Sequence, residues 1–193
     1  MATICGIDEA GRGPLAGPVT AAAVVLSPGF DTSMLADSKR LSPGKREESA
    51  NMIMKYAAWG VGWAWPEEID AINIHNATLL AMKRAYKDLN REVDRILVDG
   101  KFVPSLPAPS EAIVNGDARI PEIMAASIIA KVLRDRWMIR YAWIEPDYGF
   151  DLHKGYPTAQ HRLICSTIGL SPIHRKTFTV RPPATGPDGK RRI

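Results

Sequence analysis

The chain has 193 residues, of which 46% are hydrophobic, and its formal net charge at pH 7 is +4. A chain of this length and composition can bury a full core in one domain. No apolar run reaches the roughly 18 residues of a membrane span, and the N-terminus lacks the basic region and long hydrophobic stretch of a secretion signal. These features exclude membrane-spanning classes and predict a cytoplasmic protein with no membrane partner.

The first predicted element delivers two adjacent carboxylates. Residues 3–7 form a short β-branched run that favours a buried strand, and Asp8 and Glu9 follow it directly. Neighbouring strand residues point to opposite faces, so the two acids can share one site only if the chain bends just after them, as Gly11 and Gly13 permit. For the pair alone, a solvated turn at a strand end is the better interpretation.

The next segments alternate between strands and helices. Residues 18–26 are expected to form a strand antiparallel to the first, because the short loop between them leaves no room for a crossover. Residues 43–56 favour a helix, and residues 57–65 favour a third strand. Residues 73–89 place their apolar side chains on one helical face. The pattern predicts an α/β fold.

Two further strands also end in acids. The apolar residues 95–98 lead to Asp99, and residues 112–116 lead to Asp117, just before a helix that begins at Pro121. In open α/β sheets, functional groups collect at such strand ends because the loops there surround a common crevice. Three acid-tipped strands therefore favour a functional site over a set of solvated turns.

Clustered carboxylates indicate a divalent metal site. A hard cation such as Mg²⁺ takes oxygen ligands and keeps several waters, so a few carboxylates and a substrate phosphate complete its shell. Two such ions about 3.5 to 4 Å apart activate a water and stabilise the leaving oxygen of an in-line displacement. Without metal, the acids would repel one another. The candidate ligands are Asp8, Glu9, Asp99 and Asp117.

The C-terminal part is predicted to be mostly helical and basic. Thr158 resembles the N-cap of a helix that ends near Gly169. From His153 onward there are eight Lys/Arg and one acid, which suits a phosphate-bearing ligand. We expect residues 1–180 to form a single catalytic domain and residues 181–193, which lack apolar periodicity, to be a disordered tail.

The cysteines and histidines show no ligand spacing in the sequence. Cys5 and Cys165 are expected to be buried free thiols, and neither is a candidate nucleophile. Most of the four histidines are expected at the surface or at helix caps; they are His75, His153, His161 and His174.

Several of these features belong to longer blocks of sequence. The blocks are GIDEAGRGPLAGPV (6–19), DSKRLS (37–42), GD (116–117), AASIIAKV (125–132) followed by RD (134–135), and HKGYPT (153–158). In this order they resemble bacterial ribonuclease HII from Ile4 to Phe178. Three positions depart from the pattern of that family, namely Arg40, Met124 and Thr177, and none of them is a candidate metal ligand.

The resemblance implies an RNase H-like mixed sheet flanked by helices, with a mostly helical C-terminal part. It implies a monomeric endonuclease that cuts the RNA strand of RNA/DNA hybrids and cuts duplex DNA at single embedded ribonucleotides. It also implies two Mg²⁺ or Mn²⁺ ions, and it assigns their catalytic ligands to Asp8, Glu9, Asp99 and Asp117.

By the same resemblance, Gly11, Arg12 and Gly13 sense the ribose 2'-hydroxyl, and Tyr156 stacks at the RNA-to-DNA junction. Glycines permit the close backbone approach that reading a 2'-hydroxyl requires, and a loop aromatic can stack on a sugar or base. Lys39 could contact a phosphate. The ordinary alternatives are that Arg12 anchors a turn, that Tyr156 packs its loop on the core, and that Lys39 is a solvated surface charge.

Other classes fit less well. The spacing of Gly11, Gly13 and Gly17 breaks the dinucleotide-binding fingerprint, and residues 44–46 lack the hydroxyl group of a P-loop. A non-catalytic nucleic-acid binder has no use for acids that repel phosphate. Ribonuclease HIII shares the expected fold, but no N-terminal extension precedes Ile4. Ribonuclease HI lacks an adjacent Asp-Glu pair.

Overall fold

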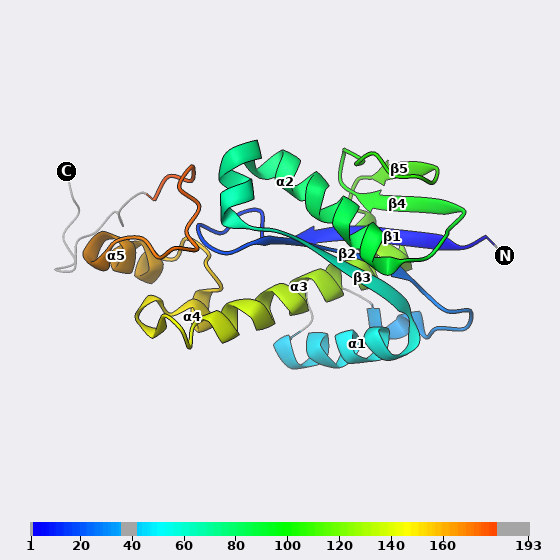
Figure 1. Cartoon of the computed structure of the whole chain (residues 1–193). Helices are drawn as coiled ribbons and strands as arrows, with labels where there is room; N and C mark the ends of the chain where they lie inside the picture. Colours follow the sequence, from blue (N-terminus) through cyan, green and yellow to red (C-terminus); the bar gives the residue numbers. More distant parts are fainter. Residues whose placement is uncertain (1, 36–41, 181–193) are drawn as a thin grey trace.

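A mixed five-stranded sheet forms the centre of the computed structural model, which describes residues 2–35 and 42–180 (Figure 1). Its strand order is β3-β2-β1-β4-β5. β1 is antiparallel to β2, as predicted, and β2 is antiparallel to β3, whereas β4 and β5 run parallel to β1. The strands are β1 (Ile4–Ala10), β2 (Val19–Val25), β3 (Ala58–Ala64), β4 (Arg95–Asp99) and β5 (Ser110–Ile113).

Helices cover both faces of the sheet (Figure 1). The helix α2 (Pro66–Leu89) packs on one face, and α1 (Pro43–Tyr56) and α3 (Pro121–Tyr141) lie on the other. Small residues allow this close packing: a Cβ atom at Gly6 of β1 would overlap the backbone of Glu122 in α3. The first strand is thereby held between two strands and two helical layers.

The first strand is longer than predicted. Its pairing with β2 continues to the pair Ala10 and Thr20, so Asp8 and Glu9 lie within the ladder and not beyond it. The chain turns at Gly11, whose φ of 94° suits a residue without a side chain. The expected bend directly after the acids is therefore displaced by one residue.

The helices agree with the sequence pattern except at the start of α2. The bounds of α1 are those predicted, with Pro43 in the first turn. However, α2 begins at Pro66 and not at residue 73, where it is kinked by a φ of 66° at Asn73. The Asn73 side chain accepts the N–H of Asn76 at 3.1 Å. Asn73 acts as an internal cap, and a regular apolar periodicity begins after it. The sequence pattern therefore predicted the helix only from this cap onward and missed its first two turns.

The C-terminal part lies beyond the end of the sheet that contains the C-terminal end of β1 (Figure 1). It contains α4 (Phe150–His153) and α5 (Ala159–Ile168), which begins after Thr158 as predicted. It also contains the short 3-10 turn η3 (Pro146–Tyr148), and Met138 of α3 packs in its separate apolar cluster with Phe150. The predicted fold class, a mixed sheet flanked by helices with a mostly helical C-terminal part, is confirmed.

The histidines correct one expectation about this part of the chain. His153, His161 and His174 are buried, not exposed, and their rings lie close together. Within residues 2–35 and 42–180, no helix has both the length and the apolar character needed to cross a bilayer.

Candidate active site

Two of the predicted acids lie side by side on the central strands. The parallel register of β1 and β4 pairs Ile7 with Val98, so that Asp8 and Asp99 follow as neighbours. Successive strand residues alternate between faces, and Ile7 and Val98 belong to the core beneath α2. Asp8 and Asp99 therefore point to the opposite face, where α3 packs.

A turn brings the next acid to Asp99. One carboxylate oxygen of Asp99, Oδ1, accepts the N–H of Gly116 at 2.8 Å and the N–H of Asp117 at 3.3 Å. Asn115 has a φ of 55°, which ends the run after β5 and starts the 3-10 turn η2 (Gly116–Ala118). The strand predicted to reach residue 116 is therefore shorter, and the buried Asp117 is held by this turn.

Glu9 joins the acids although it follows Asp8 in the same strand. The Asp8 carboxylate bonds to the backbone of the next residue: its Oδ1 accepts the N–H of Glu9 at 2.7 Å. Glu9 contacts the Arg12 guanidinium, with 3.3 Å between Oε1 and Nη1. The side chains of Asp8 and Glu9 therefore interact with each other, and the chain turns two residues after Glu9, at Gly11.

Burial and mutual repulsion perturb these acids. Burial raises the pKa of Asp8 well above its usual range, and the charges of Glu9 and Asp99 raise it further, while a hydrogen bond from Ser127 opposes them. Burial also raises the pKa of Glu9, against the lowering effect of Arg12. The ionised acids are therefore costly in isolation, and a bound cation would relieve their repulsion.

The donor set fits a hard divalent cation in an open site. In the described part of the chain, the acids do not supply three ligand atoms that all lie within 4.8 Å of one another; the group that does so is His161, Cys165 and His174. Mg²⁺ keeps several waters and takes few carboxylates together with substrate phosphates. An open arrangement of oxygen donors suits that coordination better than a closed cage would.

A cavity of about 440 Å³ adjoins Glu9. Gly11, Arg12 and Gly13 form part of its wall, and a Cβ atom at Gly13 would lie 3.9 Å from the Tyr156 ring. The structure therefore brings the glycine loop, Tyr156 and one acid to the same hollow. The polar lining residues are Glu9, Arg12, Arg46, Ser127, Lys131 and Tyr156.

Tyr156 is placed between the cavity and two basic residues. The ring is 38% exposed, Lys131 Nζ lies 5.3 Å from its centroid, and the Arg134 guanidinium carbon lies 5.8 Å from it. An aromatic ring held between cations and open on one side can accept a stacked base. Tyr156 is thus partly open to the cavity, and its stacking role stays a prediction.

Arg175 holds the loop after β1. Its buried guanidinium donates to the carbonyls of Gly11 at 2.5 Å, Arg12 at 2.9 Å and Gly17 at 3.0 Å. Burial, with a smaller contribution from the nearby charge of Arg134, lowers the pKa of Arg175 to about 9. This residue, counted by sequence as part of a basic phosphate-facing end, is instead an internal support.

Arg134 connects the same loop to the segment that carries Tyr156. Its fully buried guanidinium donates to the carbonyls of Pro18 at 2.9 Å, Ala16 at 3.1 Å and Lys154 at 3.0 Å. A Cβ atom at Gly11 would overlap the Arg134 side chain, so the glycine also makes room for this support.

Sequence reasoning missed several of these residues. Ser127 and Lys131 lie four residues apart on α3, and their helical spacing could have placed them on one face. Arg134 and Arg175 carry no sequence signal of burial. Lys39 and Arg40 belong to residues 36–41, which lie outside the described residues.

Comparisons with known proteins agree with the resemblance. The sequence profile of the family Ribonuclease HII matches residues 5–181. The ribonuclease HII of Treponema denticola is 50% identical over 197 residues, covering 92% of this chain and 98% of that protein. The ribonuclease HII of Coxiella burnetii (strain Dugway 5J108-111) is 52% identical over 176 residues, covering 91% of this chain and 87% of that protein.

Solved structures show the same fold. The PCNA:RNase HII complex from Archaeoglobus fulgidus contains a chain that is 28% identical, with a TM-score of 0.76, covering 93% of this chain and 96% of that one. Bst-RNase HIII in complex with Mn²⁺ matches with a TM-score of 0.77 at 17% identity, covering 93% of this chain and 68% of that one. At that identity the second likeness concerns the fold alone.

Asp8→Asn tests the electrostatic cost of the acids. The folded-state pKa of Asp8 is raised, so its stabilising contribution is complete below the unfolded pKa and is lost as pH rises through the folded pKa. At pH 7 in chelator, we expect the variant to unfold at higher urea than the parent. Asp31→Asn is the control: hydrogen bonds from Ser33 lower the pKa of this exposed acid, so its loss should bring no gain. A less stable Asp8→Asn would contradict the proposed repulsion.

Arg175→Met tests the support of the loop. Three buried carbonyls lose their donors, so we expect the free energy of unfolding to fall by about 2 to 5 kcal/mol in urea denaturation. Lys176→Met, at the exposed neighbouring position, should change it by less than about 0.5 kcal/mol. Equal effects of the two substitutions would argue against the assigned support.

Proposed function

Because this chain belongs to the ribonuclease HII family, it is a type HII ribonuclease H, an endonuclease that acts on nucleic acid, and we propose which residues carry that activity. Asp8, Glu9, Asp99 and Asp117 bind divalent metal, either Mg²⁺ or Mn²⁺, with two ions in the active complex. The observation that carries this proposal is the adjacency of Asp8 and Asp99 on paired central strands, with Glu9 and Asp117 held against them.

The chemistry proposed for this site is hydrolysis of a phosphodiester, leaving a 5'-phosphate and a 3'-hydroxyl with no covalent enzyme intermediate. When bound, the divalent ions supply an activated water and stabilise the leaving oxygen. The chain itself contributes the acids, in a fixed arrangement. Ser127 donates to Asp8 and so keeps one carboxylate oxygen oriented, and Arg12 pairs with Glu9 at the entrance.

We propose that the substrate is an RNA/DNA hybrid or a DNA duplex that contains single ribonucleotides. Gly11, Arg12 and Gly13 line the cavity, while Arg175 holds the carbonyls of Gly11 and Arg12 from the protein side. A loop fixed in this way offers its other side to a sugar at close range, and a 2'-hydroxyl is what distinguishes RNA from DNA there.

Three further assignments rest on the family and its substrate. Lys39 contacts a backbone phosphate, although it lies outside the described residues. The protein acts as a monomer of one catalytic domain, residues 1–180, followed by a basic tail, residues 181–193. We also propose a cytoplasmic location. A cut-site map of a duplex with one ribonucleotide, made with Mg²⁺ and with Mn²⁺, tests the substrate assignment and the choice of metal.

Asp117→Asn tests the ligand assignment. Loss of one carboxylate from the site should slow cleavage by at least about 1,000-fold, because metal ions supply several kcal/mol of transition-state stabilisation. The measurement is the initial rate on a duplex with a single ribonucleotide, with circular dichroism as the check on folding. Asp31→Asn removes an exposed acid outside the cavity and should keep the parent rate. An Asp117→Asn enzyme as fast as the parent would remove Asp117 from the ligand set.

Tyr156→Ala tests the stacking role. Base stacking on an aromatic side chain contributes about 1 to 3 kcal/mol, so cleavage at a lone ribonucleotide should slow by roughly 5- to 150-fold. Tyr156→Phe keeps the ring and should retain most of the rate. The control is Tyr56→Ala, which removes another exposed tyrosine that is distant from Tyr156 in the sequence. If Tyr156→Ala cuts this substrate as fast as the parent, the tyrosine does not stack on it.

A further inference from the structure

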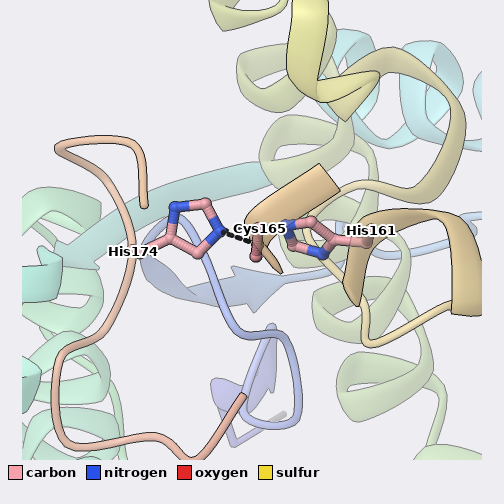
Figure 2. Close-up of side chains that lie close together, drawn as sticks. All are labelled: His161, Cys165 and His174. Atoms are coloured by element: carbon pink, nitrogen blue, oxygen red, sulfur yellow. Dashed lines mark hydrogen bonds between the residues drawn. The ribbon is translucent and has the colours of Figure 1, made fainter. Parts of the chain in front are cut away.

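A second group of metal-ligating side chains lies in the C-terminal part, outside the acidic site. His161 and Cys165 are four residues apart on α5, so both project from one helical face. His174 comes from the segment that follows α5 (Figure 2). The three candidate ligand atoms all lie within 4.8 Å of one another.

The atoms of this group are closely spaced. His161 Nε2 and His174 Nε2 are 3.0 Å apart, and Cys165 Sγ lies 3.2 Å from the same His174 nitrogen. All three residues are buried, with His161 fully inaccessible to solvent. Buried polar atoms that converge in this way have been brought out of water together, and each needs a partner.

The outer hydrogen bond of His161 orients it as a ligand. Its Nδ1 lies 2.9 Å from the carbonyl oxygen of Tyr156, so this nitrogen carries the proton and donates. The lone pair of Nε2 therefore faces Cys165 and His174. Metal-bound histidines are commonly held by such a bond from the opposite ring nitrogen to a carbonyl.

His174 carries its proton on Nε2 in the metal-free structure, because its Nδ1 accepts the N–H of Ser171 at 2.9 Å. The ring then donates from Nε2 to His161, and the group is a hydrogen-bonded cluster. Metal binding requires the proton to move to Nδ1, where the Ser171 carbonyl oxygen lies 3.2 Å away as its acceptor. Nε2 then becomes a second imidazole lone pair beside the thiol, at the cost of the bond from the Ser171 N–H.

We propose that His161, Cys165 and His174 form a Zn²⁺ site. Tetrahedral Zn²⁺ takes imidazole nitrogen at about 2.0 to 2.1 Å and thiolate sulfur at about 2.3 Å, which sets neighbouring ligand atoms roughly 3.3 to 3.7 Å apart. The separations of 3.0 and 3.2 Å need to widen by only a few tenths of an ångström. Binding displaces the Cys165 proton to solvent, and the thiolate becomes the ligand.

The fourth position belongs to a water or another small ligand. His153 stacks on His161 with 4.1 Å between ring centroids, but both of its nitrogens already have partners. Its Nε2 lies 2.8 Å from the Tyr148 carbonyl oxygen, and its Nδ1 accepts the Gly155 N–H at 3.1 Å. The site therefore has three protein ligands, all named above.

This site and the acidic site select different metals. Mg²⁺ and Mn²⁺ prefer carboxylate oxygen and water, whereas thiolate and imidazole suit Zn²⁺. The Zn²⁺ site also contacts segments that border the cavity. His161 donates to the Tyr156 carbonyl, and His174 immediately precedes Arg175. A bound ion would join α5 to the segment that supports the loop after β1.

The test is a metal titration of the full chain, after removal of metal with a chelator. We expect one equivalent of Co²⁺ to produce a near-ultraviolet sulfur-to-cobalt charge-transfer band, one equivalent of Zn²⁺ to abolish it, and a large excess of Mg²⁺ to leave it unchanged. Oxygen ligands of the acidic site cannot produce that band. No band in the folded parent would overturn the proposal.

Variants separate this site from the rest of the chain. Cys165→Ala should abolish the band, and His174→Gln should weaken Co²⁺ binding by more than the 10- to 100-fold typical of losing an outer hydrogen-bond partner. Cys5→Ala and His75→Gln, which change the other cysteine and a histidine distant from the group in sequence, should keep the band. A band that survives Cys165→Ala, or that depends on Cys5, would refute the assignment.

A measurement on the parent alone covers the case in which a variant fails to fold. The zinc-edge X-ray absorption spectrum of the 1:1 complex should show one sulfur at about 2.3 Å and imidazole nitrogen at about 2.0 to 2.1 Å. A shell of oxygen and nitrogen without sulfur would place the ion elsewhere and overturn the proposal. Neither readout depends on nuclease activity, so failure here is distinct from failure of the acidic site.

Discussion

Two buried guanidinium groups hold together the loops on which the site depends. Arg134 and Arg175 each donate to three backbone carbonyls of segments that contain no regular structure of their own. A planar guanidinium with five donors can satisfy several carbonyls at fixed angles, which a flexible lysine cannot do. Burying the two charges costs free energy, and the hydrogen bonds that each guanidinium donates to backbone carbonyls offset that cost. The same hydrogen bonds hold the loops in one arrangement. The glycine loop and the Tyr156 segment are positioned relative to each other in this way.

The acids are supported by a different part of the structure. Asp8 and Asp99 lie on strands at the centre of the sheet, which pair with other strands on both sides. This pairing and the packed helices keep the backbone from moving apart in response to the repulsion between the two carboxylates. The candidate metal ligands lie on or beside rigid strands, and one of them, Glu9, shares its cavity with the supported glycine loop and Tyr156. The chain tolerates an unfavourable charge cluster there because the rest of the sheet is closely packed, as the contact between Gly6 and Glu122 illustrates.

The same molecule contains two groups of candidate metal ligands with different chemistry. The acidic site presents oxygen donors in an open arrangement, whereas His161, Cys165 and His174 present nitrogen and sulfur in a buried one. The two are linked through the backbone, because the bond from His161 to the Tyr156 carbonyl and the position of His174 beside Arg175 connect the C-terminal group to the cavity wall. If both proposals hold, a hard ion and a borderline-soft ion would each bind near the segment that carries Tyr156.

Sequence by itself determined what depends on short-range patterns. Proline and capping residues set the bounds of α1 and α5, apolar runs predicted the strands, and motifs of fixed spacing identified the family and its candidate acids. Only the tertiary structure decided that Arg134 and Arg175 are internal supports, that Ser127 bonds to Asp8, and that distant histidines meet Cys165. Burial and long-range contact follow from how the layers pack, and a charged or polar residue carries no local signal of which layer will cover it.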